Sequence, residues 1–346
     1  MAHSKPIYRV VVDGNDITPL LMGGSGKISR LESLTLTDNR GMDADQLELV
    51  LSDHDGALAI PPKGAVITVA IGWQHSGLVD KGSYTVDESE HSGAPDKLTI
   101  RAHSADLRDG LSSKRERSWH RTTVGAMVNE MAARHKLEPV VSEDLVDELI
   151  EHIDQTSESD INLLSRIAHD FDAIATIKQK RLLFVHAGEA TTVSGQPMPL
   201  ATFSRRDGDS HRYSAADRGS HSGVKAYYQD TKGAKKAEVM VGKERTDEGA
   251  AGDNIKVLRH VYASKSSAER AARSAMRKDG RGKAEFSLSI ARGRPELVPE
   301  MPAAVQGWKP EIDGTDWLIT KVTHLLSNTG YVSQIEFEVG GGKGRD

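Results

Sequence analysis

The sequence has no cysteine among its 346 residues. A disulfide framework, a thiolate metal site and a cysteine nucleophile are therefore excluded. It also has no apolar run of the ~20 residues that a membrane span needs. The stretch from Met1 to Val12 lacks the apolar core and the cleavage site of a signal peptide. We expect a protein without a membrane anchor that is made and assembled inside the cell.

Aromatic side chains are scarce as well, with five Phe and seven Tyr. Cores built from Leu, Ile and Val are therefore expected, and few rings are available on which single-stranded nucleic acid could stack. The chain has no excess of positive charge, because 45 basic and 50 acidic residues leave a formal net charge of −5. This balance argues against a binder of duplex DNA that depends on phosphate neutralisation. We expect no sequence-specific nucleic-acid partner.

What the sequence does contain, from residue 7 to residue 103, is a series of short strand patterns. Turn residues such as Asp13-Gly14 and Asp55-Gly56 separate them. Short strands at this spacing favour a barrel or a sandwich. The clearest patterns are Tyr8–Asp13, Gln46–Ser52, Val66–Gly72, Gly82–Glu88 and Lys97–Ala102.

The middle of the chain changes its hydrophobic period to that of helices. Apolar residues recur at i, i+3, i+4 and i+7 from Val124 to Met131, and a second stripe runs from Ile161 to Phe171. Strand patterns beside these helices make the section mixed α and β. The candidate caps are Thr122 or Thr123 for the first helix and Ser157, three residues before Asp160, for the second. The strand patterns are Glu151–Asp154 and Ala173–His186.

The last part begins after a Gly-, Ser-, Asp- and Arg-rich stretch at residues 188–223, which predicts a long exposed connection and a domain boundary. A capping box at Ser266–Glu269 opens a helix that runs to Gly280. The strand patterns here are Leu200–Ser204, Gly223–Gln229, Ala237–Gly242, Ala284–Ala291, Ala303–Gly307, Trp317–His324 and Val332–Val339.

The first and last thirds of the chain echo each other. Val66–Trp73 is followed by a strand from Tyr84 to His91, and Ala303–Trp308 by a strand from Trp317 to His324. Chance likeness between strands explains the echo equally well. If it is a repeat, each chain carries two related β units, and three chains around one axis present six. Such an assembly could mate with a six-fold ring on one side and a three-fold object on the other.

Motifs that could carry chemistry fail on inspection. Gly23–Lys27 resembles a phosphate-binding loop, but a Walker A motif needs Gly at the position of Leu21 and Ser or Thr at that of Ile28. Lys27 also stands where a nucleophile elbow requires Gly. A flexible loop between strands is the better interpretation.

The fourteen histidines form no known zinc-site spacing. The nearest candidates, His152-Ile153-Asp154 and His169-Asp170, are better read as surface or partly buried residues. A glycosidase needs two carboxylates across a cleft, which a sequence cannot show. The carboxylates that stand out are Asp43, Asp45, Asp53, Asp55, Asp87, Glu88 and Glu90.

Clusters of basic residues could bind an acidic partner, although a solvated face is the better interpretation. They are Lys114–Arg117 and the helical Arg270, Arg273 and Arg277. The segment Arg205–Asp209 is ambiguous between a turn and a contact. We therefore assign no catalytic, cofactor-binding or metal-binding residue, and no interface residue.

Motifs along nearly the whole chain resemble one known family. The most specific is Ile153–Asp160 with Leu163–Ala168, which looks like the Gln-x-x-Glu-Ser-Asp helix start of phage tail hubs and of type VI secretion spike proteins. The chain thus resembles the late control D proteins, the tail hubs of P2-like phages and R-type pyocins. The other carriers are Tyr8–Val10, Asp13–Ile17, Leu31–Asp38, Asp45–Gly56, Pro61–Gly72, Gly82–Glu88, Ala102–Arg108, Arg294–Leu297, Gly307-Trp308 and Thr323–Gly330.

The resemblance implies an α+β, mainly β fold similar to the phage T4 hub, with two tube-protein-like β-barrels per chain and a mixed α/β domain between them. We predict a first barrel at 1–110, a mixed domain at 111–205 and a second barrel at 206–346 with a helix inserted near 264–280. The implied function is a non-enzymatic homotrimer in the baseplate of a phage or pyocin tail. Its implied partners are the trimeric spike, the tail tube proteins, other baseplate proteins and the tape measure protein.

Two other functions remain open. A glycan hydrolase of the tail tip would cut the cell wall with two carboxylates, although the chain has no lysozyme-like segment such as the T4 spike carries. A DNA-binding regulator would use Thr122–Leu137 as part of a helix-turn-helix, which the acidic balance disfavours.

Overall fold

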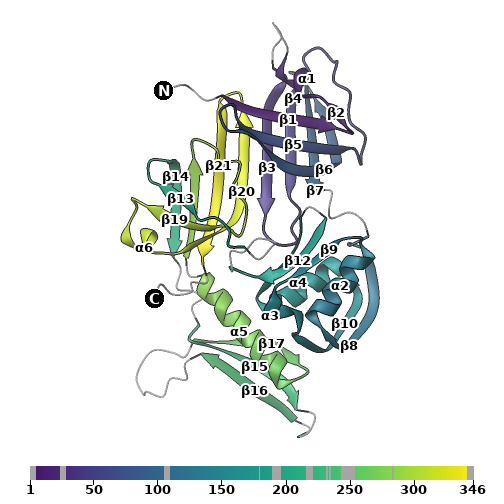
Figure 1. Cartoon of the computed structure of the whole chain (residues 1–346), viewed down its shortest axis with the longest axis vertical. Coiled ribbons are helices and arrows are strands. Elements are labelled where there is room, and N and C mark those ends of the chain that lie inside the picture. The colour runs from purple at the N-terminus through teal and green to yellow at the C-terminus, as the bar shows by residue number, and fades with distance from the viewer. Residues whose placement is uncertain are drawn as a thin grey trace.

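The computed structural model describes residues 5–23, 29–104, 110–178, 180–188, 196–215, 221–230, 233, 235–242, 254–282 and 284–340. Strands from both ends of the sequence form one 13-stranded sheet. A mixed α/β domain and a small unit around the longest helix lie below that sheet in Figure 1. The predicted fold class, mainly β with a mixed domain between two β units, is confirmed. Within the residues described, no helix is long and apolar enough to cross a membrane.

The first β unit is built from the N-terminal third of the chain. Period-two alternation turns Leu34, Leu36, Leu47 and Leu49 into its core. Helix α1 (Thr18–Met22), which follows the short strand β2 (Asn15–Asp16), adds Leu21. Its strands lie in the spatial order β3 (Leu31–Asn39), β4 (Gln46–Ser52), β7 (Lys97–Ser104), β6 (Gly77–Ser92), β5 (Val66–Trp73) and β1 (Pro6–Val12), each antiparallel to its neighbour.

The second β unit uses the last third of the chain and has an aromatic core. The ring of Phe286 lies 5.4 Å from that of Trp317 and 5.5 Å from that of Phe337. The short helix α6 (Pro310–Asp313) adds Ile312 to this core. The strands lie in the order β14 (Gly208–Ala215), β18 (Ala284–Ile290), β21 (Gly330–Val339), β20 (Trp317–Ser327), β19 (Pro302–Gln306) and β13 (Ala201–Ser204).

The two β units have the same strand order. When β3-β4-β7-β6-β5-β1 is aligned with β14-β18-β21-β20-β19-β13, each position holds strands of the same rank in the chain. The neighbours pair in the same direction except at one end, where β13 runs parallel to β19 but β1 runs antiparallel to β5. The echo in the sequence falls on equivalent strands, since Tyr84 of β6 and Trp317 of β20 are each 1% exposed.

Irregularities in the ladders coincide as well. The β6–β7 ladder shifts between Val86 and Glu88, and the β20–β21 ladder between Ile319 and Lys321. The β3–β4 ladder shifts between Leu31 and Ser33, and the β14–β18 ladder between Gly208 and Ser210. A bulge displaces every side chain beyond it, so matched bulges keep equivalent residues on equivalent faces. The two units are structural repeats of each other.

The repeats join through β20 and β3, which pair antiparallel from Lys321 with Asn39 to Ser327 with Ser33. Strand β20 therefore changes partner along its length, because Trp317 and Leu318 pair with β19 instead. Figure 1 shows the yellow β20 beside the purple β3. One continuous sheet thus fixes the two repeats relative to each other.

The mixed domain contains both predicted helices, α2 (Val124–Arg134) and α4 (Asp160–Phe171), with the one-turn helix α3 (Glu143–Val146) between them. Their apolar stripes meet in one core that includes Met127, Met131 and Leu164. Strands β8 (Lys114–Thr123) and β10 (Leu149–Ser159) form one sheet, and β9 (Glu138–Val141), β11 (Ala173–Lys178) and β12 (Arg181–His186) form another.

The helix caps were predicted with mixed success. Thr123 caps α2, because its hydroxyl accepts a hydrogen bond from the backbone amide of Ala126. The predicted cap of α4, Ser157, was wrong, since Ser159 holds that position and its Oγ accepts from the amide of Asn162 at 3.3 Å. Ser157 instead has a φ of 49° where the β8–β10 ladder shifts, so the bulge sets its conformation.

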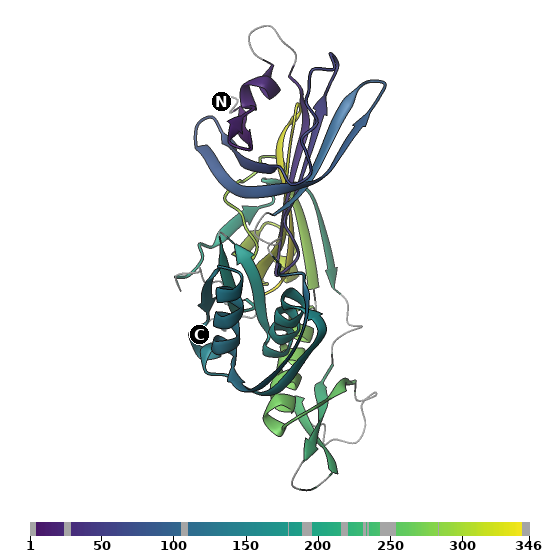
Figure 2. The same ribbon diagram turned by 90° about the vertical axis from the view of Figure 1, so that its right-hand side faces the viewer.

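A small unit interrupts the second repeat between β14 and β18. Its strands β15 (Gly223–Asp230), β16 (Lys235–Gly242) and β17 (Ile255–Tyr262) form a separate sheet, on which α5 (Lys265–Arg281) packs with its alanines. Figures 1 and 2 place this unit at the bottom of the molecule, with α5 rising from it toward the second repeat. Helix α5 was predicted, but Ser264 caps it in place of the predicted box that begins at Ser266. Its neighbouring strands were assigned to the second barrel. The domain boundaries at 110 and 205 stay predictions.

Candidate functional site at the junction of the domains

The motifs that the sequence brought forward lie apart from one another. Gly23 ends α1 in the left-handed conformation, and Gly24–Lys27 lie outside the described residues. His152 lies on β10, where its ring stacks on that of His120 at 4.6 Å, and His169 is exposed on α4. Among the described residues, no three His, Asp or Glu side chains gather as a metal site requires.

The acidic candidates of the first repeat are mostly held in ion pairs. Arg101 has its guanidinium 2.9 Å from Glu48, 3.1 Å from Glu88 and 3.6 Å from Glu90. Such cross-strand pairs stabilise a sheet, and they leave no bare pair of carboxylates here. The other pairs are Asp53 with Arg30 and His91, Asp55 with Arg30, and Asp87 with His103, while Asp43 is exposed.

The basic candidates also have partners within the chain. Arg270 of α5 lies 3.1 Å from Glu148 and over the ring of Phe171, and Arg277 lies 2.8 Å from Asp172. The expected solvated face is therefore wrong for Arg270, which is 21% exposed and packs on the mixed domain, whereas Arg277 stays half-exposed beside its partner. Arg273 lies 3.7 Å from Glu269, Arg117 lies 2.7 Å from Glu130, and Arg115 lies 3.5 Å from Asp160.

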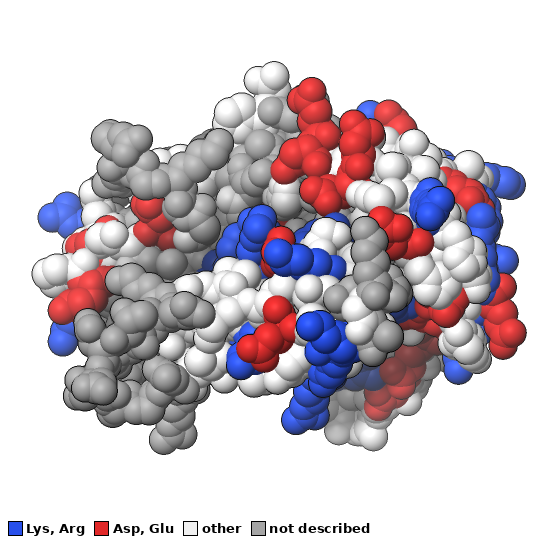
Figure 3. Space-filling model, turned by 90° about the horizontal axis from the view of Figure 1, so that it is seen from below, with Lys and Arg blue, Asp and Glu red and all other residues white. Residues whose placement is uncertain are grey.

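The ambiguous segment after β13 is a turn. The Asp207 carboxylate accepts hydrogen bonds from the amide and the hydroxyl of Ser204, at 2.8 and 2.9 Å. Arg205 and Arg206 are exposed on this turn. Seen from below, in Figure 3, basic and acidic side chains are interspersed over the part of the surface that the structure describes. The described part of that face therefore carries no broad patch of one sign.

The family motif around Gln155 is a structural device that joins β10 to α4. Gln155 Nε2 donates to the Asp160 carboxylate at 2.8 Å and to the Glu158 carbonyl at 3.0 Å. The side chain of Asp160 is fully buried, and its other oxygen accepts from Arg134 and His135, each at 2.8 Å. Burial raises the pKa of Asp160, but these hydrogen bonds outweigh it and hold the pKa below its usual value. The motif therefore fixes where α4 begins.

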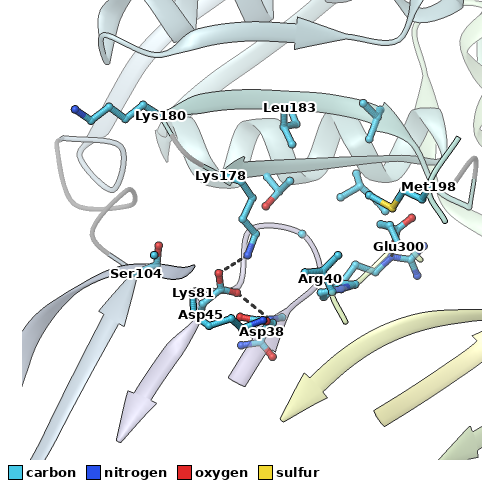
Figure 4. Close-up of a pocket in the computed structure, with 18 of the residues that line it drawn as sticks. Asp38, Arg40, Asp45, Lys81, Ser104, Lys178, Lys180, Leu183, Met198 and Glu300 are labelled. Atoms are coloured by element: carbon cyan, nitrogen blue, oxygen red, sulfur yellow. Dashed lines mark hydrogen bonds and ion pairs between the residues drawn. The ribbon is translucent and has the colours of Figure 1, made fainter. Parts of the chain in front are cut away.

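A cavity of about 630 Å³ lies where the mixed domain meets the two repeats. Figure 4 shows the sheet of β11 and β12 on one side of it and the ends of the repeat strands on the other. Charged side chains converge here from separate parts of the chain. The lining includes Asp38, Arg40, Asp45, Lys81, Lys178, Leu183, Met198 and Glu300.

One half of this junction links the first repeat to the mixed domain. Lys81 Nζ lies 2.8 Å from the Asp38 carboxylate, and both side chains are less than a tenth exposed. Lys81 also donates to the carbonyls of Pro295 and Leu297. Lys178 reaches from β11 to the carboxylate of Asp45. The first repeat thereby contacts both other parts through lysines.

The other half centres on arginines. Arg40 lies between the carboxylates of Glu300, at 2.5 Å, and Glu338. Arg281, at the end of α5, forms a two-point pair with Asp172 of the mixed domain and lies 3.5 Å from Glu338. One chain of alternating charges thus crosses from the first repeat through the second to α5 and the mixed domain.

Burial and pairing shift the pKa values of the junction in opposite directions. Burial raises the pKa of Asp45 and of Glu300, although Lys178 and Arg40 oppose it. Burial also acts on Asp172, but Arg281 and Arg277 prevail and lower its pKa. Each of these carboxylates faces a cation, so the arrangement holds the domains together.

A buried histidine ends the network inside the joint between the repeats. His324 of β20 is completely buried, with Nδ1 at 3.0 Å from the Ser333 hydroxyl and 2.9 Å from that of Tyr331. Burial, with the charge of Lys81, lowers the pKa of His324 to about 3. The histidine is therefore a neutral member of the core.

Of this junction, only Asp45 was singled out from the sequence. Its charged members lie on six separate segments, and Arg40 and Glu338 are 298 positions apart. No local spacing could have grouped them. The one available signal was the abundance of charged residues at predicted strand ends.

Fold and junction together define a class: a multidomain assembly protein with a duplicated β unit and interdomain ion pairs. The family described as phage tail baseplate hub (GPD) matches residues 44–330. The chain belongs to this family, and it is a baseplate hub protein of phage tails of the P2 kind.

One curated relative agrees with that assignment, and a solved structure shares the fold. A probable baseplate hub protein of Escherichia phage P2 is 44% identical over 96% of this chain and 93% of its own. A 43 kDa tail protein of prophage MuSo2 from Shewanella oneidensis has a similar fold, with a TM-score of 0.70 at 13% identity over 97% of this chain and 99% of that one.

Another similar structure comes from the type VI secretion system. This E. coli protein is a component of the type VI secretion system with structural similarity to the T4 tail proteins gp27 and gp5. Its TM-score is 0.52 at 13% identity, over 90% of this chain and 73% of that one. The likeness shows a shared fold and confirms the predicted resemblance to hubs of this kind.

Proposed function

We propose that this hub protein works as a homotrimer that adapts the six-fold tail tube to a three-fold spike. The observation that carries the proposal is the repeat: two β units with one strand order and matching bulges. Three copies around one axis present six equivalent units to a hexameric ring. The parts that occur once per chain, the mixed domain and the α5 unit, present a three-fold face to a trimeric partner.

The proposed partners follow from that symmetry. The first ring of tail tube proteins would contact the six repeats, and the trimeric spike would contact the three-fold face. Other baseplate proteins would surround the hub, and the tape measure protein would end in its lumen. Assembly would take place in the bacterial cytoplasm, in a phage tail or in a headless R-type pyocin.

The junction supports a rigid adapter. Its ion pairs join all parts of the chain, and Asp172–Arg281 and Asp38–Lys81 are almost fully buried. Breaking such a pair leaves a buried charge without its partner, at a cost of about 3–5 kcal/mol. A hub built this way keeps its domain positions under load.

The solution mass tests the proposal most simply. Light scattering on the purified chain is expected to give three times the 37.6 kDa chain mass for the chain alone, or that mass plus the mass of the spike trimer once the spike is added. A chain that remains a monomer in both would contradict the adapter.

We infer further that the role is not catalytic. Asp38, Asp45 and Glu300 of the cavity each have a cation partner, which supports a structural use. Incubation with purified peptidoglycan should release no soluble fragments above a buffer control. The rival hydrolase predicts release that Asp38→Asn or Asp45→Asn abolishes while Asp43→Asn does not.

A further inference from the structure

Two of the strand edges that lack a partner strand within the described residues belong to β14 and to the end of β6. Strand β14 ends the path of the 13-stranded sheet, with β18 on one side only. Residues 88–92 of β6 pair with β7 on one side, while β5 pairs with β6 only up to Thr85. Unpaired edges of this kind are templates for pairing with another chain.

The two repeats are joined within the chain by the pairing of β20 with β3. In the alignment of the repeats, β6 is equivalent to β20 and β14 is equivalent to β3. Matched ladders and bulges align β20 with β6, so that Lys321 corresponds to Glu88. They align β3 with β14, so that Thr37 corresponds to Ser214. The chain therefore contains one complete joint, β20 with β3, and both halves of a second joint, β6 and β14, which are not paired with each other.

The halves of the second joint lie on different sides of the first. Figure 1 places β14 at the left of the sheet and β6 at the right, with β20 and β3 between them. Their joining therefore requires a second copy of the chain in a head-to-tail arrangement, which closes into a ring if the rotation allows. We propose that residues 88–92 of β6 pair antiparallel with β14 of the neighbouring protomer. This inference rests on the proposed trimer and names its interface.

The intact joint fixes the register of the proposed one. Thr323 pairs with Thr37 and Leu325 with Thr35. Translated through the repeat, Glu90 stands opposite Ser214 of the neighbour, and Ser92 stands opposite Arg212. Glu90 and Arg212 are then diagonal neighbours on one face, where opposite charges attract. Both side chains are exposed in the single chain.

The loop that runs past this edge is compatible with pairing. Gly64 and Ala65 exchange backbone hydrogen bonds with Val86 of β6. The same bonds recur at the intact joint, where Glu300 and Met301 exchange them with Ile319. Strand β20 pairs with β3 beyond that point, so β6 has room for a partner at the equivalent place.

Cysteine pairs test the interface directly, because the chain has no cysteine of its own. The double variant E90C/S214C should form covalent trimers on oxidation or with a short bifunctional thiol reagent, seen on a non-reducing gel. The matched control E90C/R212C changes exposed residues on the same face but places them diagonally, at ~7–8 Å, too far for easy disulfide formation. We expect several-fold fewer covalent trimers from it and none from either single variant.

Light scattering on the same samples separates the two levels of the proposal. A trimer of E90C/S214C that yields no covalent trimers would overturn the strand pairing and leave the adapter function standing. A monomer, for the unmodified chain with its spike as well, would overturn the adapter and the interface together.

Discussion

Asp160 shows how a single residue holds two elements in place. It is fully buried and accepts hydrogen bonds from Gln155, Arg134 and His135. The sequence singled out the motif but not this role, because Arg134 and His135 come from a different helix end. The part of the site that lies in one segment could be predicted, and the partners it meets in space could not.

The variant Asp160→Ala should lower the free energy of unfolding by about 3–5 kcal/mol, because it leaves buried charge and three donors unpaired. Urea unfolding measures the loss. The control Asp43→Ala, at an exposed acid, should change stability by less than about 0.5 kcal/mol. Equal effects of the two variants would mean that Asp160 does not organise the motif.

His324 predicts a pH dependence of stability. Its pKa is about 3 in the folded chain and about 6.5 in the unfolded chain. Between these values only the unfolded state binds the proton, so stability falls as pH decreases below 6.5, by about 1.4 kcal/mol per pH unit at most. Above pH 6.5 this group has no effect on stability.

The variant His324→Gln keeps an acceptor beside Tyr331 and Ser333 and removes the titration. Urea unfolding at pH 7, 6 and 5 measures the free energy of unfolding. It should fall less steeply with decreasing pH for this variant than for the parent, by up to about 1.4 kcal/mol per pH unit. Parallel curves for the variant and the parent would show that His324 is not the group responsible.

At the scale of elements, the sequence patterns predicted α2, α4 and α5 and most strands, but the capping residue was predicted correctly only for α2. The cap of α4 was misassigned because the sequence pattern Ser157 to Asp160 has the spacing of a capping box, whereas β10 contains a one-residue bulge and continues to Ser159. The sheet of β15–β17 was missed because a period-two pattern says which face is buried but not which strand is the neighbour.

The corrected cap gives a matched test. Ser159→Ala should lower the free energy of unfolding by about 1 kcal/mol, because the amide of Asn162 loses its acceptor. Ser157→Gly should be neutral or stabilising, since Ser157 has a positive φ that glycine adopts readily. Thermal unfolding of both variants measures their loss of stability. A larger loss for Ser157→Gly than for Ser159→Ala would mean that Ser157 is the cap of α4.

At the scale of the whole molecule, the sequence echo pointed to the repeat, but the joint between repeats could not be predicted. Strands β20 and β3 pair although they lie near opposite ends of the sequence. The pairing of two edge strands produces no periodic pattern in the sequence of either strand. The charged junction has the same character, since Arg40 and Glu338 come together only once the sheet has formed.

The central claim is that repeats within one chain and joints between chains together make a ring of six like units. Cryo-electron microscopy of the assembled hub, viewed down its axis, tests it most directly. The expected map has three-fold symmetry, with six β units at one radius joined by a continuous sheet around an open centre. Two sets of β units at different radii, or a break in the sheet between protomers, would contradict the account.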